Sequence, residues 1–217
     1  GNLFIAALIE VLGDVEEAMD ATSKVLRVRG KVIPSSAEKL RLNAEMTDGR
    51  IVEGESQIPH AHGKIKRVFT TPEHPRAIQS AVDAIREADA IVLGPGSLYT
   101  SIMPNLCVPD IVQAVRISRQ AGGKVIDFVI ANNGDVDPAV LQRYVAHGSH
   151  PVMIDKKEVS QTGATLILSD LINKENSATH DTKKLANVLF DLINALRTDL
   201  SPELLHYYLK RYTFNHR

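Results

Sequence analysis

The spacing of apolar residues changes along the chain from a helical period to an alternating one. Apolar side chains surround residues 2–12 almost completely, which predicts a buried helix. Asp14 is a typical N-cap, and a single packing stripe predicts a second helix after it. From residue 30 to residue 71 the period is two, and Asp48-Gly49 is a hairpin turn signal. The first third of the chain is therefore expected to form a helix pair and a small antiparallel unit.

Beyond residue 71, helical patterns alternate with short, wholly apolar runs of the kind found in covered parallel strands. The expected strands are 90–93, 124–131, 152–154 and 165–168. The expected helices are 74–89, 111–120, one opened by Asp137-Pro138 and closed by Gly148, one opened by Asp181 and one opened by Ser201-Pro202. Alternating strands and helices indicate a mostly parallel sheet with right-handed crossovers. The expected fold class is α/β, with helices on both faces of this sheet and a small antiparallel hairpin unit.

Charge and cysteine content exclude several classes of protein. Lys and Arg total 25 and Asp and Glu total 26, so the chain lacks the basic excess of a general nucleic-acid binder. The single cysteine, Cys107, allows no disulfide within the chain and no cysteine-based zinc site. No apolar run approaches the roughly 20 residues that span a bilayer, and the start lacks a signal-peptide pattern. A cytoplasmic protein without a membrane span is expected.

The segment after the expected strand 90–93 is the strongest candidate site, because ligands of open parallel sheets bind beyond the carboxyl ends of strands. Glycines let backbone approach an anion closely, hydroxyls donate hydrogen bonds, and a helix N-terminus adds partial positive charge. An ordinary turn with solvated hydroxyls is the alternative. The candidate ligand-binding residues in this loop are Gly94, Gly96, Ser97, Thr100 and Ser101.

The turn Asn132-Asn133-Gly134 follows the next expected strand. Asn side chains both donate and accept hydrogen bonds, which suits ribose, sugar or base edges, but they also favour tight turns. Weaker candidates are His60 and His62 as a metal pair, Glu55 and His180 near a ligand, and a cation cluster of Arg27, Arg29 and Lys31, which either neutralises phosphate or lies on an exposed face. No pattern specifies a nucleophile.

The segment 89–106, with its run GPGSLYTSIMPNL, resembles the signature of the gluconeogenesis factor family, of UPF0052 type. That family is related to the 2-phospho-L-lactate (CofD-like) transferases that build the deazaflavin coenzyme. Further resembling stretches are Gly1–Leu3, Val28–Pro34, Glu45 with Asp48-Gly49, Gly54–Ser56, Val129–Gly134 and His180-Asp181. The resemblance covers most of residues 1–195 and implies a single CofD-like domain over 1–217 with a Rossmann-like core.

The resemblance also implies a nucleotide-type ligand. Gluconeogenesis-factor relatives resemble UDP-sugar binders that act in carbon-metabolism, cell-wall and cell-shape control, whereas transferase relatives bind a guanine nucleotide, phospholactate and Mg²⁺. Carried onto this chain, the loop 94–101 contacts phosphate or sugar, Asn2 and the turn 132–134 line the same cleft, and Tyr144 contacts a sugar nucleotide.

Three departures from the family pattern fall at ligand loops. The initial strand with its glycine-rich loop is missing, a strand and loop are missing near 121–123, and Thr179 stands in place of an arginine. We expect the missing segments to be omitted from the sequence as given, because loss of a central strand would leave buried backbone unpaired.

Two functions remain open on the sequence alone. A sugar-nucleotide-binding regulator fits the loop 98–102 and the 5% aromatic content, which offers a deazaflavin little stacking surface. The alternative is a phospholactate-type transferase, in which Glu55 or Asp135 helps to hold Mg²⁺. An NAD-dependent enzyme lacks its glycine motif here. The apolar face of the last two expected helices either caps the core or forms a homo-oligomer contact; it includes Leu204, Leu205, Tyr208 and Leu209.

Overall fold

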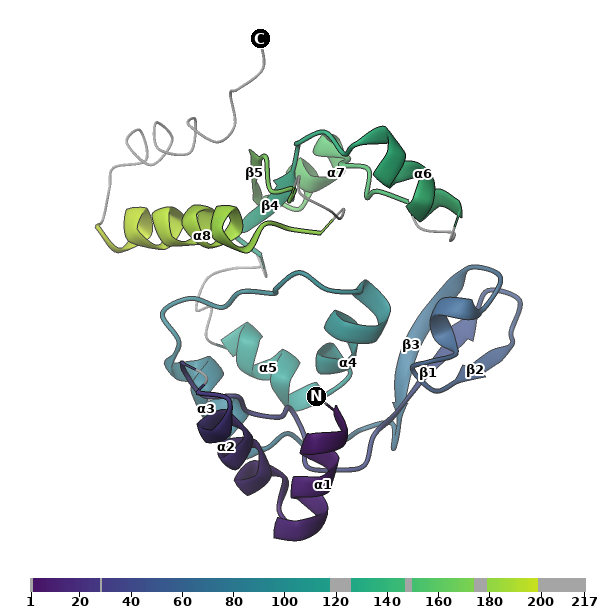
Figure 1. The fold of residues 1–217 in the computed structure, drawn as a ribbon, viewed down its shortest axis with the longest axis vertical. Helices are drawn as coiled ribbons and strands as arrows, with labels where there is room; N and C mark the ends of the chain where they lie inside the picture. The colour runs from purple at the N-terminus through teal and green to yellow at the C-terminus, as the bar shows by residue number, and fades with distance from the viewer. Residues whose placement is uncertain (1, 28, 118–125, 147–149, 174–178, 199–217) are drawn as a thin grey trace. The chain divides into compact units, whose positions relative to one another are not determined.

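The chain forms a mixed α/β structure of two compact units, Gly1–Gln120 and Ala121–Arg217, in a computed structural model (Figure 1). The structure describes residues 2–27, 29–117, 126–146, 150–173 and 179–198. The first unit holds helices and a three-stranded antiparallel sheet, and the second holds a two-stranded parallel sheet with helices. The predicted α/β class is therefore confirmed. Among the described residues, no helix is both long and apolar enough to cross a bilayer.

The first unit begins with the helix pair that the sequence predicts. Helices α1 (Asn2–Leu12) and α2 (Val15–Val25) pack against each other (Figure 1). The Asp14 carboxylate accepts a 2.8 Å hydrogen bond from the amide of Glu17, which caps α2. The prediction that α1 is buried is wrong, since Leu3 is 87% exposed. A helix that is apolar all round needs neighbours on every side, and α2 covers only part of its surface.

The antiparallel sheet has the strand order β2-β1-β3, with β1 at Arg41–Met46, β2 at Ile51–Glu53 and β3 at Ile65–Thr71. Gly49 has φ +87° in the β1–β2 turn, a conformation that glycine adopts at little steric cost. The buried face packs around Met46 and a short 3₁₀ helix, η1 (Ile58–His60); its other members are Leu42, Ala44 and Val68. The predicted antiparallel unit is confirmed.

A bulge in this sheet gathers charge on Glu45. The β1–β3 register shifts between Glu45 and Met46, so that Lys66 has no opposite residue in β1. The Lys66 Nζ and Arg67 Nε atoms consequently both reach the Glu45 carboxylate, at 2.6 Å and 2.7 Å. Their hydrogen bonds hold the pKa of Glu45 below its usual value, because they stabilise the ionised carboxylate.

The remaining elements of the first unit are helical: α3 (Gln79–Glu87), the π-helix η2 (Leu98–Ile102), α4 (Met103–Leu106) and α5 (Pro109–Ile117). Helices α3 and α5 pack together through Ala81, Val108 and Ile111.

Helix α3 begins later than the predicted start at residue 74. Pro75 has no amide proton, and the amides of residues 76–78 donate outside the helix. Their acceptors are, in order, Glu38 Oε1 at 2.7 Å, Asp110 Oδ2 at 3.1 Å and the Ser35 carbonyl at 3.2 Å. These bonds connect the start of α3 to the chain before β1 and to α5, so the segment takes an extended path instead of a helical turn.

Two predicted strands are not formed. Residues 90–93 have no strand neighbour within the described ranges, and Val92 and Leu93 remain 51% and 52% exposed. Residues 152–154 also have no strand pairing. An apolar run becomes a strand only when a neighbouring strand satisfies its backbone groups.

The second unit is built on two parallel strands, β4 (Phe128–Asn132) and β5 (Thr165–Ser169). In the described part of this unit they are accompanied by the helices α6 (Pro138–Ala146), α7 (Lys156–Gln161) and α8 (Thr182–Arg197). Helix α8 covers the sheet through Val188 and Leu192, which pack with Ile167, Leu171, Phe128 and Ile130. The predicted N-caps of α6 and α8 are confirmed, since Asp137 and Asp181 accept amides of the first helical turns.

Some predicted features cannot be compared with the structure. The described residues do not include Gly148, the segment 121–123, the expected helix from Ser201 or the apolar residues 204–209.

The Glu45 cluster predicts an acid-dependent contribution to stability. Because the pKa of Glu45 is lowered on folding, its stabilisation is complete above the usual value of 4.5 and is lost as pH falls through the folded value. We expect Glu45→Gln to lower the free energy of unfolding at neutral pH, measured by urea denaturation, and the difference from the unmodified protein to shrink in acid. Glu53→Gln is the control, since Glu53 pairs with Arg41 at 3.1 Å with both side chains largely in water. An equal loss at all pH values for Glu45→Gln would contradict the account.

Candidate functional site

The loop after residues 90–93 is closed by one carbonyl group. The Ser97 carbonyl accepts the amides of Ser101 at 2.9 Å and Ile102 at 3.1 Å, and the Leu98 carbonyl accepts the amide of Met103. These wide turns form the π-helix η2, a conformation that is rare and frequently found at functional sites. The Asn105 side chain donates to the Ser101 carbonyl at 3.0 Å, which ties η2 to α4.

Glycine at position 96 permits the close approach inside this turn. A Cβ atom placed on Gly96 would lie 3.0 Å from the Cβ of Ser101, so any side chain there would displace Ser101. Gly94 differs, because a Cβ there would meet nothing within 4 Å. The backbone at Gly94 is therefore open to an approaching group, while Gly96 keeps the turn compact.

The hydroxyls of this loop point to polar recognition. Ser97 and Ser101 are exposed and Thr100 is half-buried. Within the described part of the chain, none of the three hydroxyls has a hydrogen-bond partner. The first amides of a helix also lack an acceptor within the helix, and they carry partial positive charge. The loop thus presents hydroxyl and amide donors together, which is the chemistry that binds phosphate or a hydroxylated ring.

In the second unit, the turn after β4 is held by the Asn132 side chain. Its Oδ1 atom accepts the amides of Gly134 at 3.1 Å and Leu171 at 2.8 Å, and its Nδ2 atom donates to the Gly134 carbonyl at 2.9 Å. Asn132 therefore ties the end of β4 to the end of β5. The backbone amide of Asn133 donates to the Ser169 carbonyl at 3.0 Å, and among the described residues its half-buried side chain forms no hydrogen bond.

Asp170, a carboxylate that the sequence analysis missed, lies next to this turn. Asp170 follows β5, and its Oδ2 atom accepts a 3.0 Å bond from the Lys184 ammonium, which also donates to the Ile172 carbonyl. A Cβ atom on Gly134 would lie 2.2 Å from Asp170 Oδ1. The signal was present in the sequence, because Asp170 follows a predicted strand whose carboxyl end shares an edge with that of β4.

A cavity of about 280 Å³ lies beside the same turn. Apolar side chains form much of its lining, and two carboxylates and an amide add polar groups; the lining residues are Asp135, Val136, Asp137, Pro138, Val140, Ile172 and Asn173. Asp137 Oδ1 caps α6 through the Ala139 amide at 2.7 Å, so its carboxylate is partly engaged. Tyr144 lies farther along α6 and is 39% exposed.

The candidate residues thus form two groups, one in each unit. Gly94, Gly96, Ser97, Thr100 and Ser101 share one turn, and the residues 132–134 share another with Asp170. A single cleft lined by both groups stays a prediction. The side chain of Asn2 lies outside the described part of the structure.

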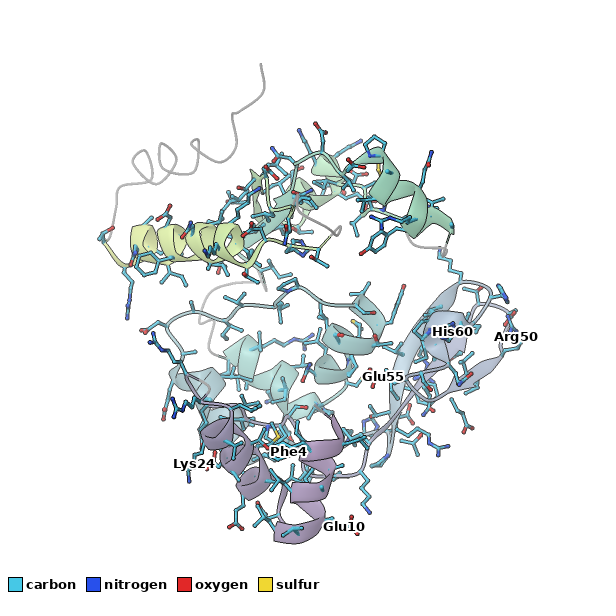
Figure 2. All side chains as sticks on the ribbon, viewed as in Figure 1. Phe4, Glu10, Lys24, Arg50, Glu55 and His60 are labelled. Atoms are coloured by element: carbon cyan, nitrogen blue, oxygen red, sulfur yellow. The ribbon has the colours of Figure 1, made fainter. Side chains whose placement is uncertain are left out.

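The weaker candidates lie at separate places in the described structure. Within the described ranges, no three His, Cys, Asp or Glu side chains gather as metal ligands. His60 belongs to η1 and Glu55 to the turn after β2 (Figure 2). His62 contributes its carbonyl to the Arg50 guanidinium at 2.7 Å, and the exposed His180 forms an isolated bridge with Ile172.

Cys107 lies against the core of the antiparallel sheet. Its Sγ atom donates to the Val68 carbonyl at 3.7 Å, and it packs against the core of the antiparallel sheet. Burial raises the pKa of the Cys107 thiol, which favours the protonated, unreactive form.

The contact between Gly134 and Asp170 predicts a strong effect of a single methyl group. Gly134→Ala forces a shift of Asp170, which Lys184 holds in place, and we expect a loss of about 1–3 kcal/mol in the free energy of unfolding. Gly94→Ala is the matched control, since its added methyl meets nothing within 4 Å. Chemical denaturation of both variants tests this, and equal midpoints for the two would show that the turn accommodates the methyl group.

Comparison with known proteins identifies the family. The sequence profile of the family described as "2-phospho-L-lactate transferase CofD" matches residues 1–121. A protein named "Gluconeogenesis factor" from Bacillus subtilis is 37% identical over 224 residues, covering 89% of this chain and 71% of that protein. A relative from Nostoc is 39% identical over 222 residues, covering 87% of this chain but only 49% of its own length. The chain therefore spans about half of the Nostoc protein and 71% of the Bacillus subtilis protein.

The fold agrees with this assignment. The crystal structure of a UPF0052-family protein from Bacillus halodurans superposes with a TM-score of 0.79 at 33% identity, covering 88% of this chain and 71% of that one. Together with the profile match, which includes the whole loop 94–101, this shows that the chain belongs to the CofD family, as a member of its gluconeogenesis factor (UPF0052) group.

Proposed function

We propose that this protein binds a sugar nucleotide of the UDP type and acts in the cytoplasm as a regulator of carbon metabolism, cell wall and cell shape. The relatives named gluconeogenesis factor support the link to carbon metabolism. The observation that carries the ligand class is the loop of η2, where three hydroxyls without partners in the described chain stand beside helix-start amides.

The loop suits the diphosphate of such a ligand. A diphosphate presents several acceptor oxygens, and the loop offers several donors: the hydroxyls of Ser97, Thr100 and Ser101 and the first amides of η2. Gly94 lets the backbone approach the ligand without a side chain in the way.

Taken by itself, the second unit offers groups of the kind that bind the hydroxyls of a sugar or a ribose. The Asn133 amide both donates and accepts, and the carboxylate of Asp135 accepts from ring hydroxyls at the rim of the adjoining cavity. Apolar walls from Val136, Pro138 and Val140 favour a ring face over a second anion. The partly exposed ring of Tyr144 is available for a sugar-nucleotide contact.

A transferase of the phospholactate type is the second candidate, because the matching profile carries that description. It would use a guanine nucleotide with Mg²⁺. Within the described ranges no cluster of three carboxylates or histidines exists for the ion. Mg²⁺ would therefore take most of its ligands from phosphate oxygens and water, with Glu55 or Asp135 as a single protein carboxylate.

Calorimetric titration separates the two functions. We expect UDP-N-acetylglucosamine to bind without Mg²⁺, and Ser97→Ala/Thr100→Ala to weaken binding by about tenfold or more, since each hydrogen bond to a charged group contributes about 1.5–3 kcal/mol. Preference for GDP with Mg²⁺ would favour the transferase instead.

The control variant removes two exposed hydroxyls elsewhere in the same unit, Thr47→Ala/Ser56→Ala, and should bind as the unmodified protein does. If neither nucleotide binds, or if both double variants lose affinity equally, the loop is not the ligand site.

A further inference from the structure

A basic hollow of the first unit shares no lining residue with the loop 94–101. It has a volume of about 550 Å³ and is formed by the last turns of α2 and the chain that follows; its lining residues are Asp20, Ser23, Lys24, Arg27, Gly30 and Lys31. Lys24 stands at the surface of α2 (Figure 2). None of these residues belongs to the candidate site described above.

The positive charge of the hollow exceeds the negative charge at the C-terminus of α2. The C-terminus of a helix carries about −0.5 elementary charge, and Asp20 adds one negative charge. Lys24, Arg27 and Lys31 bring three positive charges, so the hollow retains a clear positive excess. Within the described ranges, none of these three cations forms an ion pair. Stabilisation of the helix end therefore does not account for all of them.

Arg27 occupies a position that glycine suits better. Its φ is +49°, the one positive value among the described non-glycine residues, and its amide donates to the Lys24 carbonyl at 3.3 Å just after the helix end. Left-handed residues that end helices are usually glycine, because a Cβ atom is unfavourable there. An arginine therefore does not favour the backbone conformation at this position. The residue contributes its guanidinium group to the hollow.

We propose that this hollow binds a small multivalent phosphate, as a second anion site independent of the sugar-nucleotide loop. Arg27 supplies a planar set of donors that matches two phosphate oxygens, while Lys24 and Lys31 add point charges and Ser23 a hydroxyl. Two ammonium groups, one guanidinium and one hydroxyl match the several oxygens and charges of a di- or triphosphate better than those of a single carboxylate.

The test is an NMR titration of the ¹⁵N-labelled chain with inorganic pyrophosphate, compared with sodium chloride at equal ionic strength. We expect pyrophosphate alone to shift the amides of Ser23, Lys24, Arg27 and Gly30. Ser97→Ala/Thr100→Ala should leave these shifts intact, so this test is independent of the proposed function. A parallel titration with ADP shows whether the same hollow also accepts phosphate carried by a nucleoside.

Arg27→Gly is the decisive variant, because it removes the guanidinium and relieves the left-handed backbone. It should fold with an unchanged or higher melting temperature and bind pyrophosphate about tenfold or more weakly. Lys24→Gln/Lys31→Gln should weaken binding similarly, whereas Arg86→Gln, in the last turn of α3, should not. Equal shifts with chloride, or full binding by Arg27→Gly, would overturn the proposal.

Discussion

The hydrogen bonds that the Ser97 carbonyl accepts from Ser101 and Ile102 are the interaction on which the candidate site depends. They wind residues 98–102 into a π-turn, and that turn places three hydroxyls and the first helical amides on one small segment. Gly96 allows this geometry, since a side chain there would press on Ser101. A standard α-helical start would arrange the same residues differently, so the donor set follows from the backbone as much as from the residue types.

In the second unit, side-chain hydrogen bonds hold the turns at the ends of the parallel strands. Backbone groups beyond the last ladder bond need partners, and the Asn132 side chain bonds three of them: the amide and the carbonyl of Gly134 in its own turn, and the Leu171 amide beyond β5. A side chain at position 134 would press on Asp170, which Lys184 holds. Asn132 is thus a residue that shapes the turn in this structure, and Asp135 lies beside it at the adjoining cavity.

Features set by neighbouring residues could be predicted from the sequence, and features set by distant ones could not. The caps Asp14, Asp137 and Asp181 and the hairpin turn at Gly49 follow from local chemistry, and all are found. The strand expected at 90–93 failed because a strand needs a partner, and α3 starts late because distant groups take its first amides. Similarly, the sequence located the turn 132–134 but left its role open, since the Leu171 amide that engages Asn132 lies far along the chain. The sequence singled out the loop 94–101, while its π-turn depends on one carbonyl that no residue pattern reveals.

Hydrogen–deuterium exchange of the intact chain, with and without UDP-N-acetylglucosamine, tests most directly whether this loop is the ligand site. The account predicts that the sugar nucleotide slows exchange of the amides of residues 98–100, which lack acceptors within η2, while exchange in the antiparallel sheet of β1–β3 stays unchanged. Unchanged exchange at 98–100 under saturating ligand, with protection appearing elsewhere, would contradict it.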